Sequence, residues 1–141
     1  MIDVNFQIPG PLRGKQRPRA TKMGRMYTPK ETVNAEAYIK FLAAEAMGDD
    51  EPLEGPIKLV VYICVEIPNS FSKTKRAAAL EGLEYPTTKP DLDNCVKLLA
   101  DAMNGIVYKD DKQIVSLVVS KLYSSAAHTR VYISRAGVGD D

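Results

Sequence analysis

The chain has 141 residues, of which 45% are hydrophobic and 26% charged, and its formal net charge at pH 7 is +1. This length and composition predict one soluble globular domain over residues 1–136, followed by a disordered tail at 137–141. No apolar run is long enough to span a membrane and the N-terminus lacks the apolar core of a signal peptide, so we expect a cytoplasmic protein without membrane contact. Cys64 and Cys95 lie in apolar patterns and are predicted to be buried thiols, and the single histidine, His128, argues against a His-rich metal centre.

A basic segment follows the first predicted strand. Residues 2–8 alternate apolar and polar side chains, which predicts a half-buried strand. The next stretch has no acidic residue and carries Arg13, Lys15, Arg17, Arg19, Lys22, Arg25 and Lys30. The first six are our predicted DNA contacts, because such a stripe is typical of surfaces that bind phosphates, although a merely solvated arm is the alternative. Gly14, Pro18 and Gly24 interrupt it, which predicts a surface loop or a loose hairpin.

Three more elements are predicted in the middle of the chain. Thr28 and Pro29 begin a helix that ends near Gly48. The expected buried side of this helix consists of Val33, Ala37, Phe41 and Ala44, with Tyr38 and Leu42 alongside. Residues 57–67 are almost continuously apolar, which predicts a strand buried on both faces. A short helix over 72–80 carries Lys73, Lys75 and Arg76, which either contact DNA or form the solvated side of a surface helix.

The aspartates concentrate in one later segment, where five of them fall within the 21 residues from Asp91 to Asp111. A helix over 92–104 is predicted from the spacing of its apolar residues Leu92, Val96, Leu99 and Met103. Asp91 would be its N-cap and Gly105 would follow its end. A polar line on another side consists of Asp93, Lys97 and Asp101. Two closing strands are predicted over 113–122 and 130–134.

These aspartates have a structural and a chemical interpretation. Asp91 suits an N-cap, Asp93 with Lys97 is an ordinary i,i+4 pair, and the pair Asp110 and Asp111 suits a solvated turn. Capping needs only one aspartate, however, whereas two precede the helix or lie in its first turn and two follow its end, where the returning chain could bring them together. Mg²⁺ is usually held by one or two carboxylates together with substrate phosphate. The cluster therefore also suits metal-dependent phosphoryl chemistry, with a lysine nearby to offset phosphate charge.

The run KPDLDNCVKLLADAMNGIVYKDDKQIVSLVVSK, residues 89–121, resembles the signature region of the RusA family of Holliday-junction resolvases. These are Mg²⁺-dependent endodeoxyribonucleases of bacteria and their phages. The resemblance rests on Asp-Leu-Asp-Asn, a lysine four residues after the second aspartate, Asp-Ala near the helix end and Asp-Asp before a strand. It implies that Asp91, Asp93 and Asp111 are catalytic carboxylates that hold Mg²⁺, with Lys97 assisting and Asp110 as a further ligand. Mn²⁺ could replace Mg²⁺ at such a site.

The order of the predicted elements indicates an α+β domain with a small mixed or antiparallel sheet and helices packed on it. The resemblance implies that this RusA-like domain forms a homodimer that cuts opposed strands of a four-way DNA junction during recombination and repair. One alternative is a non-catalytic basic DNA-binding protein whose aspartates are structural. Another is a small-molecule metal phosphohydrolase, although the long basic stripe argues against a compact substrate.

Overall fold

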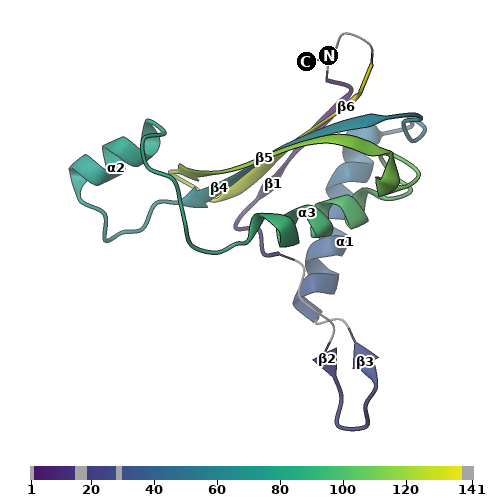
Figure 1. Ribbon diagram of the computed structural model, residues 1–141, viewed down its shortest axis with the longest axis horizontal. Helices are drawn as coiled ribbons and strands as arrows, with labels where there is room; N and C mark the ends of the chain where they lie inside the picture. The colour runs from purple at the N-terminus through teal and green to yellow at the C-terminus, as the bar shows by residue number, and fades with distance from the viewer. Residues whose placement is uncertain (1, 15–18, 28–29, 138–141) are drawn as a thin grey trace.

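The computed structural model describes residues 2–14, 19–27 and 30–137 (Figure 1). Its elements, in chain order, are β1 (Val4–Pro9), β2 (Arg19–Ala20), β3 (Met26–Tyr27), α1 (Lys30–Met47), β4 (Ile57–Glu66), α2 (Lys73–Leu80), α3 (Leu92–Met103), the 3-10 helix η1 (Asp111–Gln113), β5 (Ile114–Ser124) and β6 (His128–Arg135). The expected α+β class is confirmed. The predicted helix start at Thr28 and Pro29, and the predicted tail beyond Gly137, lie outside the described residues.

Four strands form one mixed sheet in the order β1-β6-β4-β5. β6 pairs antiparallel with both β1 and β4, whereas β4 and β5 run parallel. Only three residues separate β5 from β6, which suits a hairpin, yet β4 lies between these two strands in the sheet. Parallel neighbours need a crossover connection, and here the chain between β4 and β5 contains α2 and α3. The segment with the aspartates is therefore the crossover of a parallel strand pair.

The hydrophobic core lies between one face of the sheet and the helices α1 and α3 (Figure 1). Alternate residues of β4, from Ile57 to Ile63, point into it and are almost completely buried. The opposite face has no helix over it, so Val60 and Tyr62 are only half-buried. The prediction that this strand is buried on both faces is wrong for most of its length, because only one layer of helices covers the sheet.

The buried side of α1 also differs from the predicted one. Ile39, Ala43 and Met47 are the buried residues, at a spacing of four. The residues predicted to be buried are instead exposed, with Leu42 half-buried: Val33, Ala37, Tyr38, Phe41 and Ala44. Because apolar residues occur on two sides of this helix, periodicity alone could not decide which side packs against α3 and β1.

The basic segment forms a hairpin, as predicted. β2 and β3 pair antiparallel, and the hairpin projects from the body of the protein (Figure 1). The Thr21 side chain closes the turn by accepting a hydrogen bond from the Arg25 backbone N–H at 3.1 Å. Across the described ranges, no helix is both long and apolar enough to cross a membrane.

Candidate active site

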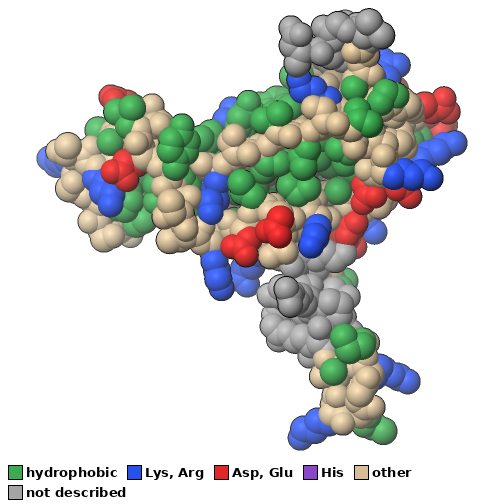
Figure 2. Space-filling view, viewed as in Figure 1, with side chains coloured by type: hydrophobic (Ala, Val, Ile, Leu, Met, Phe, Trp, Pro, Cys, Tyr) green, Lys and Arg blue, Asp and Glu red, His purple; other side chains and the backbone are tan. Residues whose placement is uncertain are grey.

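Helix α3 carries most of the predicted site. Its buried side includes Cys95, Leu98, Leu99 and Met103, which are inaccessible to solvent. Cys64 and Cys95 are both buried free thiols, as predicted, and burial raises the pKa of the Cys95 thiol to about 11. With that side fixed in the core, Asp93 and Lys97 are left exposed. Figure 2 shows acidic side chains on both sides of a basic one along the edge of the body where α3 lies.

Asp91 occupies the N-cap position of α3 without capping it. Its backbone is extended, with φ −76° and ψ 131°, but its side chain makes no capping hydrogen bond. An N-cap aspartate normally accepts a hydrogen bond from a backbone N–H in the first turn. The exposed Asp91 carboxylate is thus oriented for a partner other than the helix. This observation favours the chemical over the structural interpretation of Asp91.

Asp110 has the opposite character, because it caps η1. Its Oδ1 accepts a hydrogen bond from the Lys112 backbone N–H at 2.9 Å, and its own N–H donates to Gln113 Oε1 at 3.1 Å. The Gln113 side chain also donates to the carbonyls of Leu53 and Gly55, each at 3.0 Å. This turn is therefore fastened to the loop before β4, and Asp110 has a clear structural role in it.

Asp111 lies among other carboxylates at the C-terminal end of α3. The pKa of its carboxyl is raised, first by desolvation, then by a hydrogen bond with Asp110 and by the negative charges of Asp110 and Asp101. A hydrogen bond with the Asn104 side chain has the opposite effect. The charges of Asp101 and Asp110 thus make the surroundings of Asp111 locally negative.

The replacement Asp101→Asn is expected to lower the pKa of Asp111 toward its ordinary value, because one of the negative charges that oppose its ionisation is removed. Asp111 would then lose its proton at a lower pH than in the parent protein. NMR titration of the carboxyl carbons in metal-free protein measures this midpoint directly. Asp49→Asn, an exposed change beyond the end of α1, is the control. An unchanged Asp111 midpoint in Asp101→Asn would contradict the arrangement.

The structure does not gather Asp91, Asp93 and Asp111 into one pocket. Among the residues that the structure describes, no three Asp, Glu, His or Cys side chains lie close enough together to hold a metal ion. The reason is the length of α3: Asp111 lies near Asp101, and eight residues of helix separate Asp101 from Asp93, which is about 12 Å of rise. The expectation that the returning chain closes this distance within a single chain is wrong. The role of each aspartate as a ligand remains a prediction.

The donor chemistry nevertheless suits Mg²⁺ at either end of α3. Carboxylate oxygens are the ligands that this ion prefers, and one or two of them suffice when water and substrate phosphate complete the octahedron. Asp91 and Asp93 offer exposed carboxylates at the N-terminal end, and Asp111 offers one beside Asp101 at the other.

The predicted DNA-binding residues fall into three groups. Arg13, Lys22 and Arg25 are exposed, the last two on the projecting hairpin (Figure 2). Lys15 and Arg17 lie outside the described residues, and Arg19 contributes its backbone to the pairing of β2 with β3. On α2, Lys73 is exposed, whereas Lys75 Nζ lies 4.3 Å from the centre of the Phe71 ring and Arg76 donates a hydrogen bond to the Pro68 carbonyl at 3.3 Å. The role of α2 in DNA binding stays a prediction.

Lys121 is a positioning residue, whereas the sequence suggested a solvated side chain near a strand end or a phosphate contact. It lies on β5, and its ammonium donates hydrogen bonds to the Pro90 carbonyl at 3.0 Å and to the Thr88 carbonyl. Both acceptors belong to the loop that leads into Asp91. A lysine near the middle of a strand gives no sign of such a contact, because only the parallel register of β4 and β5 brings it beneath the loop.

The replacement Lys121→Met is expected to loosen the 86–90 loop, because two backbone carbonyls lose a charged donor whose hydrogen bonds contribute roughly 1.5–3 kcal/mol each. Hydrogen exchange measured by mass spectrometry should become faster in peptides that cover this loop. Lys112→Met, an exposed lysine at η1, serves as the matched control. Equal exchange rates in the parent protein and Lys121→Met would show that the contact does not hold the loop.

Comparison with known proteins identifies the class to which this fold and motif belong. The family described as endodeoxyribonuclease RusA matches residues 9–134, from β1 to β6. The chain therefore belongs to the RusA endodeoxyribonuclease family. A similar protein is the uncharacterized protein YqaN of Bacillus subtilis strain 168, which is 35% identical over 135 residues, covering 92% of this chain and 94% of that protein.

Proposed function

We propose that this protein is a Mg²⁺-dependent Holliday-junction resolvase that makes paired symmetric nicks in opposed strands of four-way DNA. The observation that supports this most is the Asp91 carboxylate, which occupies a capping position without capping, within a family of endodeoxyribonucleases. Asp91 and Asp93 would hold the metal at one end of α3, and Asp111 would complete the ligand set. Lys97, one turn along the helix from Asp93, would offset the charge of the phosphate at the cut.

When bound, Mg²⁺ supplies an acidified water and neutralises charge at the phosphate. The protein's own part is to orient and retain the DNA. Lys22 and Arg25 on the projecting hairpin, together with the exposed Arg13 on the body, would contact the DNA backbone without reading bases. Affinity for DNA should consequently fall steeply with salt, as counterion release requires.

A homodimer would solve the problem of the separated carboxylates. The edge strand β5 exposes Val115 and Leu117, whose side chains are 66% and 47% accessible, and Leu117 faces the side of the sheet on which α3 lies. Two copies joined there about a two-fold axis across α3 would place the N-terminal end of one helix beside the C-terminal end of the other. Each site would then combine Asp91 and Asp93 of one protomer with Asp111 of its partner. Two equivalent sites also suit the symmetry of a four-way junction.

Mixing two inactive variants tests this shared site. Asp93→Asn and Asp111→Asn are each expected to be inactive alone. In a mixed dimer one site has both changes, whereas the other has the native Asp93 of one protomer and the native Asp111 of its partner. Refolded mixtures should therefore recover single nicks without recovering paired cuts. No recovery in mixtures that demonstrably form heterodimers would mean that each site lies within one protomer.

A labelled synthetic four-way junction, incubated with and without Mg²⁺, tests the overall proposal. We expect symmetric nicks that require the metal, and retention of the junction in a gel-shift assay without it. Retarded junction with no product under any divalent metal would instead support a non-catalytic DNA-binding protein. Cleavage of a small phosphodiester without junction binding would support a phosphohydrolase.

A further inference from the structure

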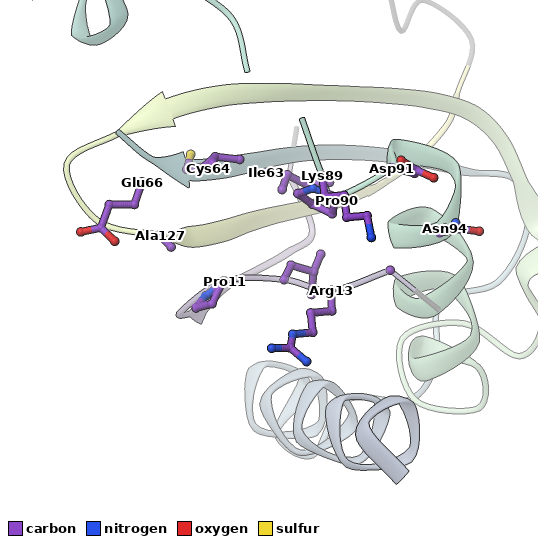
Figure 3. Close-up of a pocket in the computed structure, with 13 residues that line it drawn as sticks. Pro11, Arg13, Ile63, Cys64, Glu66, Lys89, Pro90, Asp91, Asn94 and Ala127 are labelled. Atoms are coloured by element: carbon purple, nitrogen blue, oxygen red, sulfur yellow. The ribbon is translucent and has the colours of Figure 1, made fainter. Parts of the chain in front are cut away.

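A cavity of about 790 Å³ lies at the N-terminal end of α3 (Figure 3). Its apolar lining comes from three separate parts of the chain. These parts contribute Leu12 from the segment after β1, Ile63, Cys64 and Val65 from the end of β4, and Ala127 from the turn before β6. The volume is within the range of pockets that enclose small organic ligands. It is large enough for one nucleotide and too small for a duplex.

Charged groups surround this cavity on the side of the proposed cleavage site. Arg13 and Lys89 line it, and the Lys89 side chain extends toward its centre in Figure 3. Asp91 and Asn94 form the wall next to α3, and Glu66 lines the cavity at the end away from Asp91. The two cations near Asp91 suit the anionic phosphate of a nucleotide, and the apolar interior suits its flat, weakly polar base. The wall that holds Asp91 is continuous with the proposed metal site.

We propose that this cavity binds one nucleotide flipped out of the branched DNA, next to the phosphate that is cut. The inference rests on the proposed function and names the part of the substrate that the site recognises. A base can enter only if it leaves the helical stack, which costs less where stacking is already interrupted. Nucleotides at the centre of a four-way junction lose the stacking of a continuous helix, whereas those within a continuous duplex keep it. Branched DNA would therefore fill the cavity more readily than a duplex, and the bound nucleotide would position the neighbouring phosphate at Asp91.

A cysteine introduced in place of Ala127 provides a chemical probe of this proposal. Ala127 lines the cavity and is partly exposed, whereas the native Cys64 and Cys95 are both buried. Junctions that carry a disulfide-activated tether on a single base, moved one position at a time, should form a mixed disulfide with the Ala127→Cys variant at one or two positions near the cut. Metal-free protein is used, so the result does not depend on catalysis. The parent protein should give no such product.

Two neighbouring alanines supply a matched pair of variants. Ala127 lines the cavity, whereas Ala126, the preceding residue, is exposed and does not line it. Ala127→Leu should reduce the preference for junction over duplex DNA by about tenfold or more, the size of one lost base-stacking contact. Ala126→Leu should leave this preference unchanged, and thermal unfolding checks that both variants are folded.

The possible outcomes separate this inference from the proposed function. Position-specific trapping in the Ala127→Cys variant together with the Ala127→Leu effect supports the nucleotide pocket. Uniform trapping or none, with junction binding and cleavage intact, overturns the pocket and leaves the nuclease in place. Failure of the parent protein to bind junctions at all overturns the proposed function first.

Discussion

Asp93→Asn is expected to reduce Mg²⁺-dependent cleavage of a four-way junction by roughly 10²–10³-fold or more, the size of effect seen when one preorganised electrostatic group is lost. Asparagine keeps the shape of the side chain but removes the charge that binds a hard cation. Asp91→Asn should behave in the same way, because its carboxylate has no structural hydrogen bond to lose. Single-turnover cleavage with saturating enzyme measures this effect on the chemical step.

The same variants should bind the junction as well as the parent protein, or slightly more tightly, because a negative charge near a polyanion has been removed. A metal-free gel-shift titration measures this affinity. Asp50→Asn, an exposed change outside the site, controls for the general effect of a lost carboxylate. Full cleavage activity in either site variant would reject the assignment of these aspartates. Lost affinity with lost folding would support a structural role instead.

Gly14→Ala is expected to reduce cleavage by about a hundredfold, because displacement of a site by about 1 Å has effects of that size. The Gly14 backbone lies directly against the first turn of α3. A Cβ at this position would lie 2.5 Å from the Cβ of Asn94 and 3.3 Å from its carbonyl carbon. Either the segment after β1 or the start of α3 must move, at a cost of about 1–3 kcal/mol in stability. Both movements displace groups beside Asp91.

A double-mutant cycle identifies the cause of that effect. Asn94→Gly removes the Cβ that the new methyl group would meet, so Gly14→Ala should destabilise the Asn94→Gly background less than the parent protein. Chemical denaturation of the four proteins should give a coupling energy within the range of about 0.5–3 kcal/mol expected for residues in contact. Additive effects would mean that the two positions do not touch.

The motif helix was largely predictable because a single side of it is apolar. Leu99 and Met103 enter the core as expected, and the exposed positions of Asp93 and Lys97 follow from that. Helix α1 was not predictable to the same degree. It carries apolar residues on two sides, and only the tertiary packing selects Ile39 over Phe41. Local periodicity therefore predicted where both helices lie in the chain, but it predicted the buried side of α3 only.

The site itself depends on long-range pairing that the sequence does not encode locally. The parallel register of β4 and β5 places Lys121 under the loop before Asp91, and Gln113 reaches Leu53 and Gly55 across about sixty residues of chain. The distance between the two ends of α3 also decides which carboxylates meet. Sequence spacing indicated which residues to consider but not their separation, because a straight helix keeps its ends apart.

Contacts hold the loop before α3 and the η1 turn after it, so the length of α3 sets the distance between the carboxylates at its two ends. Each inserted residue would add about 1.5 Å and turn the following side chains by about 100°. One extra residue between Asp93 and Asp101 would therefore place Asp101 on the opposite side of the helix from Asp93 and shift the attached η1 turn with it. The stretch between α2 and the motif, over residues 81–88, can change in length without altering that geometry. Proteins of this family should accordingly vary in length before the motif and keep the number of residues within it constant.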